Sequence, residues 1–122
     1  MGTWGASLLD DDLALDIRGC FEGALEAGES PEVAARGLMN TEVAREILEE
    51  FAEDERDDSF WEESRGLFYA VATIQLAHGV LEDDVRRQTL QAITAERRGL
   101  DREADAERWT ILDELETRLG GK

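Results

Sequence analysis

The stretch that decides the fold runs from Ser59 to Leu81 and reads SFWEESRGLFYAVATIQLAHGVL. From Gly66 onward it contains no Asp, Glu, Lys or Arg, and its large apolar side chains point to several sides of a 3.6-residue turn. A helix that is apolar all round is buried by its neighbours. Ser59 and Glu62 have the spacing of a capping box, and Gly79 is a typical residue just beyond a helix end. We therefore expect a central helix over about 59–78.

Amphipathic segments lie on both sides of this stretch. Apolar residues that recur at steps of three and four predict helices that could pack around the central one. These segments cover about 13–27, 31–40, 41–55, 83–97 and 101–119. No strand pattern and no internal repeat occurs. The predicted fold class is all-α, a compact bundle of five to six helices around the central apolar helix.

The segment between residues 30 and 55 has two start signals. Ser30 followed by Pro31 is a strong helix start, because serine caps a helix and proline suits its first position. Val33, Ala34 and Leu38 could form a short inward stripe, and Thr41 offers a fresh cap. We expect two helices here, and a single bent helix is the alternative.

The length of 122 residues suits a single domain over 1–122. Within it, residues 1–9 form an irregular segment, and two glycines around Trp4 suggest that its ring packs on the core. Cys20 is the only cysteine, so an intrachain disulfide is excluded and the residue is expected in the core. A secretory signal and a membrane-spanning run are not recognisable, which predicts a cytoplasmic protein.

The charge is strongly negative, with 30 acidic residues against 13 basic ones and a net charge of −17. It is uneven: residues 1–40 carry 8 − 2, or six net negative charges, and residues 41–80 carry 11 − 3, or eight. Residues 81–122 carry only 11 − 8, or three. Such a field repels nucleic acid and anionic membranes and attracts basic proteins.

The densest charge is the run EEFAEDERDD over 49–58, with seven acids and one base. One interpretation is a solvated helix end followed by a loop. The other is a docking site for a basic partner. Its candidate partner-binding residues are Glu49, Glu50, Glu53, Asp54, Glu55, Asp57 and Asp58.

Catalytic and metal patterns are scarce. The one histidine, His78, falls at the end of the central helix, where a favourable interaction with the helix dipole is the simpler interpretation. The aspartates at 10–12 lack the alternating ligands and the glycine bend of a calcium loop. Zinc would need more His and Cys ligands than the chain holds. We predict no catalytic residue, no metal, no cofactor and no enzymatic activity.

The opening Met1-Gly2-Thr3-Trp4-Gly5, followed by the aspartates at 10–12, resembles a group of small bacterial proteins. They begin Met-Gly-x-Trp-Gly with a following Asp-rich triplet and form a domain of unknown function. A second landmark of that group is Gln-x-x-x-Gly-x-Leu at the end of an apolar helix, matched here by Gln75, Gly79 and Leu81. The resemblance implies a helical fold and no particular activity.

These observations favour a non-enzymatic acidic binding protein. Its concrete form is an immunity protein or inhibitor that neutralises a basic partner such as a toxin, nuclease or other nucleic-acid-binding protein, through protein–protein interaction. One alternative is a DNA mimic that inhibits a DNA-binding protein. A small-ligand-binding domain with a pocket beside Trp4, Trp61 and His78 is another, and a homodimeric structural subunit is a third.

Overall fold

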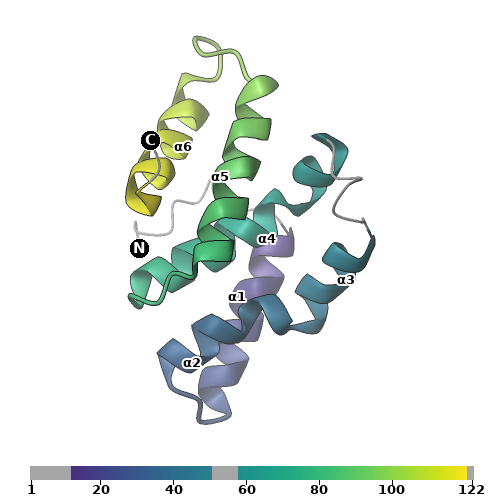
Figure 1. Ribbon diagram of the computed structural model, residues 1–122, viewed down its shortest axis with the longest axis vertical. Coiled ribbons are helices and arrows are strands. Elements are labelled where there is room, and N and C mark those ends of the chain that lie inside the picture. Colours follow the sequence, from purple (N-terminus) through teal and green to yellow (C-terminus); the bar gives the residue numbers. More distant parts are fainter. Residues whose placement is uncertain (1–11, 51–57, 121–122) are drawn as a thin grey trace.

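The computed structural model describes residues 12–50 and 58–120, which form a bundle of helices (Figure 1). In chain order the helices are α1 (Asp12–Glu26), α2 (Pro31–Arg36), the 3₁₀ helix η2 (Gly37–Asn40), α3 (Glu42–Glu50), α4 (Asp58–Ala77), α5 (Asp83–Arg98) and α6 (Ala106–Leu119). Over this part of the chain no strand is present. The all-α fold class and the bundle of helices are confirmed.

Helix α4 is the centre of the bundle, as its sequence predicts. It packs most extensively against α5 on one side and α1 on the other, and also contacts α2 and α6. Phe60 and every residue from 66 to 75 are buried. Near the start of α4, the ring of Trp61 lies 4.8 Å from that of Phe60 and 5.6 Å from that of Phe68. The apolar surface of α4 therefore forms the core that the other helices cover.

The end of α4 is fixed by a glycine and a glutamine. Gly79 has a φ of +69°, a conformation that glycine adopts without a steric penalty, and Val80 N–H donates to the carbonyl of Gln75 at 2.9 Å. The Gln75 side chain is buried. Its amide donates to the carbonyl of Ala35 in α2, and its oxygen accepts from the N–H of Glu82, both at 3.0 Å. Gln75 thus ties α4 to α2 and to the start of α5.

The start of α4 differs from expectation. The helix begins at Asp58, one residue before the start expected at Ser59. At the other end of the chain, α6 begins at Ala106 rather than near 101. Asp101 instead accepts hydrogen bonds from the N–H groups of Glu103 and Ala104, which hold a tight turn before the helix.

The two start signals between residues 30 and 41 are both confirmed. The Ser30 hydroxyl accepts from the N–H of Val33, and the Thr41 hydroxyl accepts from the N–H of Ala44. Val33 itself is 54% exposed, so its predicted inward position is wrong. The short helix α2 turns the smaller Ala34 and Ala35 inward instead, which allows close approach to α4.

None of the helices among residues 12–50 and 58–120 combines the length and the apolar content needed to cross a bilayer. The irregular segment predicted over residues 1–9 lies outside the described residues.

Candidate functional site

The predicted partner-binding run lies only partly within the described structure. Glu49 is exposed near the end of α3, Glu50 is the last residue of that helix, and Asp58 is the first residue of α4. Glu53, Asp54, Glu55 and Asp57 lie outside the described residues.

The acidic character of this run continues along α3 and onto α1 and α2. Between residues 13 and 49 the chain carries eight acids and three arginines, and all eleven are exposed. The acids are Asp16, Glu22, Glu26, Glu29, Glu32, Glu42, Glu46 and Glu49. Three of them, Glu42, Glu46 and Glu49, follow one another at steps of four and three, so they share one face of α3 and line the same surface hollow with Arg45.

Arginines of the C-terminal half are used differently, because several join one helix to another. Arg86 of α5 donates to the carbonyls of Leu119 and Gly120 at the end of α6, at 2.8 and 3.3 Å. Arg97 pairs with Asp113 and Glu116 of α6, and its guanidinium lies over the ring of Trp109. These contacts hold α5 and α6 together.

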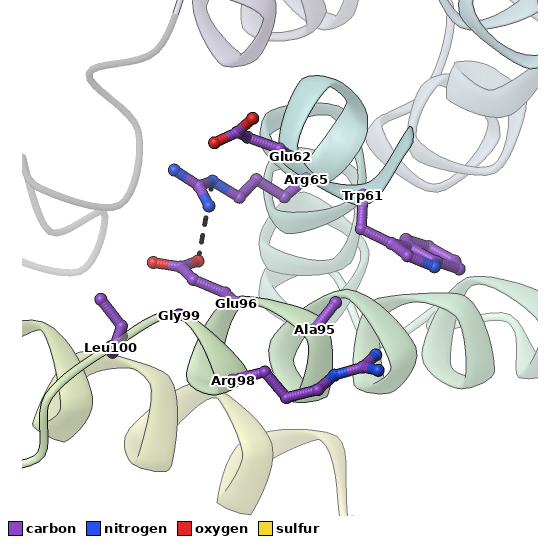
Figure 2. A pocket seen from close by; sticks show the side chains of 8 residues that line it. All are labelled: Trp61, Glu62, Arg65, Ala95, Glu96, Arg98, Gly99 and Leu100. Atoms are coloured by element: carbon purple, nitrogen blue, oxygen red, sulfur yellow. Dashed lines mark ion pairs between the residues drawn. The ribbon is translucent and has the colours of Figure 1, made fainter. Parts of the chain in front are cut away.

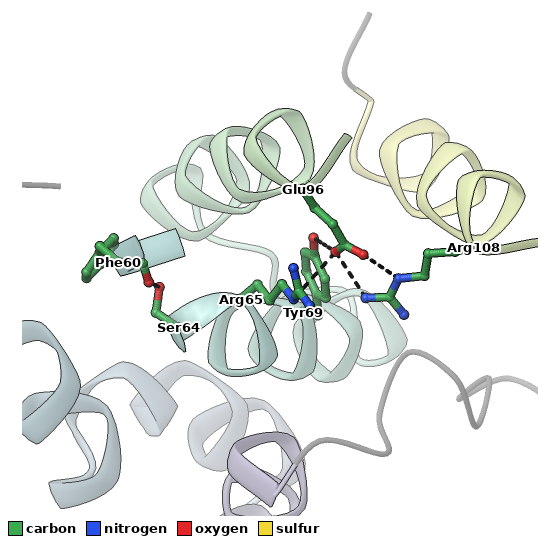
Figure 3. Close-up of polar contacts among 6 residues, drawn as sticks. All are labelled: Phe60, Ser64, Arg65, Tyr69, Glu96 and Arg108. Carbon is green, nitrogen blue, oxygen red and sulfur yellow. Dashed lines mark hydrogen bonds and ion pairs between the residues drawn. The ribbon is translucent and has the colours of Figure 1, made fainter. Parts of the chain in front are cut away.

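The most buried charge in the described structure is Glu96 of α5, whose side chain is 4% exposed (Figure 3). Its carboxylate accepts from Arg108 Nε at 2.5 Å and Arg108 Nη2 at 3.0 Å, a bidentate pair across α5 and α6. The Tyr69 hydroxyl of α4 donates to Glu96 Oε1 at 2.7 Å, and Arg65 Nε lies 3.8 Å from the same oxygen. We call these four residues the Glu96 cluster.

The contacts within the Glu96 cluster determine the protonation states of Glu96 and Tyr69. Burial alone would raise the pKa of Glu96, but hydrogen bonds from Arg108 and Tyr69 and the charges of Arg108 and Arg65 outweigh it and lower the pKa below its usual value. Burial, followed by the negative charge and the hydrogen bond of Glu96, raises the pKa of Tyr69 above its usual value. Near neutral pH Glu96 is therefore ionised and Tyr69 is a neutral donor, which suits a structural junction better than proton transfer.

A pH dependence of stability follows from the lowered pKa of Glu96. Because its folded-state pKa lies below the unfolded value of about 4.3, Glu96 contributes full stability above that pH and loses the contribution as the pH falls through the folded pKa. Urea titrations from pH 7 down to pH 3 should show the difference in stability between wild type and Glu96→Gln shrinking as the pH falls. A difference that stays constant over this range would contradict the assignment.

An open pocket of about 530 Å³ lies beside the Glu96 cluster, between the start of α4 and the end of α5 (Figure 2). Its lining comprises Trp61, Glu62, Arg65, Ala95, Glu96, Arg98, Gly99 and Leu100. The small-ligand alternative placed Trp61 and His78 at one pocket. His78 lies near the other end of α4, about 25 Å along the helix, with its ring 5.3 Å from that of Phe21. Trp4 lies outside the described residues.

The sequence interpretation missed the Glu96 cluster, although one pattern pointed to it. Val85, Thr89, Ala92 and Glu96 follow one another at steps of four, three and four, and all are buried. A glutamate on an otherwise inward stripe predicts a buried carboxylate that needs cationic partners. Within residues 12–50 and 58–120, no three His, Cys, Asp or Glu side chains are grouped closely enough to hold a metal ion.

Comparisons of the chain with protein-family models, with curated proteins and with solved structures gave no match.

Proposed function

We propose that this chain is a non-enzymatic binding protein that neutralises a basic protein partner through the acidic surface of α1–α3. The observation that carries the proposal is the stripe of exposed carboxylates on α3, Glu42, Glu46 and Glu49, which leads directly into the acidic run over 49–58. The carboxylates of the α3 stripe and of the acidic run over 49–58 would together attract a cationic partner.

Electrostatics of this kind act mainly on the rate and specificity of association. Opposite potentials steer two proteins into encounter, and salt screens the attraction over about 8 Å at physiological ionic strength. A partner with a strongly positive surface, such as a cationic toxin or nuclease, matches a protein with a net charge of −17. An immunity protein or inhibitor is therefore the form of the function that we favour.

The test compares two variants with equal changes in net charge. Glu42→Gln/Glu46→Gln/Glu49→Gln neutralises the α3 stripe, and Glu103→Gln/Glu107→Gln/Glu114→Gln removes three exposed charges at and before α6. Against a panel of basic nucleases measured by biolayer interferometry, we expect at least one to bind the wild type. The α3 variant should lower its association rate by about tenfold, and the α6 variant by much less.

Raised ionic strength should weaken the same interaction, because the charges involved are exposed. Equal losses in the two variants would show that only the overall charge matters and would contradict a site on α3. Full binding by both variants would contradict the proposal altogether. Circular dichroism of each variant checks that the helical fold is retained.

A further inference from the structure

We draw no further inference here: the strongest candidate, the open groove of about 790 Å³ that the outer face of α5 forms with Trp61 of α4, carries none, because Arg87 on that face already pairs with Asp84 and nothing in the part of the chain that the structure describes shows what covers it.

Discussion

Replacing Glu96 with glutamine should destabilise the protein by about 3–5 kcal/mol, a large share of the 5–15 kcal/mol typical of a domain. The substitution retains the shape of the side chain but removes the carboxylate charge that pairs with Arg108 and Arg65 and accepts from the Tyr69 hydroxyl. Arg108, which is partly buried, then loses both of its charge-assisted hydrogen bonds to that carboxylate. Urea denaturation at pH 7, followed by circular dichroism, measures the change in the free energy of unfolding.

A matched control separates the effect of position from that of charge. Glu22→Gln removes the same charge from an exposed pair with Arg18 on α1, and should change stability by no more than about 0.5 kcal/mol. Tyr69→Phe should fall between the two, since it removes only the hydrogen bond to Glu96. If Glu96→Gln costs less than about 1 kcal/mol, the cluster does not hold α4, α5 and α6 together.

The helices of this protein could be predicted well because their determinants are local. The apolar composition of α4, the caps at Ser30 and Thr41, and the stop at Gly79 each depend on a few neighbouring residues. The late start of α6 shows the limit of this reasoning. Asp101 does accept hydrogen bonds from the following N–H groups, as a capping residue would, but the helix does not continue from that turn.

The candidate site could be predicted only in part because it joins residues that are distant in sequence. Tyr69 and Glu96 are 27 residues apart, and their hydrogen bond depends on how α4 crosses α5. Periodicity places Glu96 on the inward stripe of its helix, but it does not identify which arginine lies opposite. The pocket beside Arg65 likewise depends on the position of the α5 end relative to α4, which no local pattern specifies.

Truncation of the core of α4 should have an effect as large as that of Glu96→Gln. Phe68 is fully buried, and its ring lies 5.6 Å from that of Trp61 and 6.4 Å from that of Phe60. Phe68→Ala removes these contacts and leaves a cavity in a close-packed interior, which should cost about 3–5 kcal/mol in the free energy of unfolding. Chemical denaturation measures this cost, and Phe68→Leu, which leaves a smaller cavity, should lose less.

The exposed Leu15 of α1 provides the comparison, since 49% of its surface is accessible. Leu15→Ala should change stability by less than about 0.5 kcal/mol, because a half-exposed side chain leaves no cavity when it is shortened. Equal costs for Phe68→Ala and Leu15→Ala would mean that α4 is not the packed centre of the bundle. A large cost at Phe68 alone would instead show that the apolar stretch from Gly66 to Ala77 provides the common surface on which α1, α2, α5 and α6 pack.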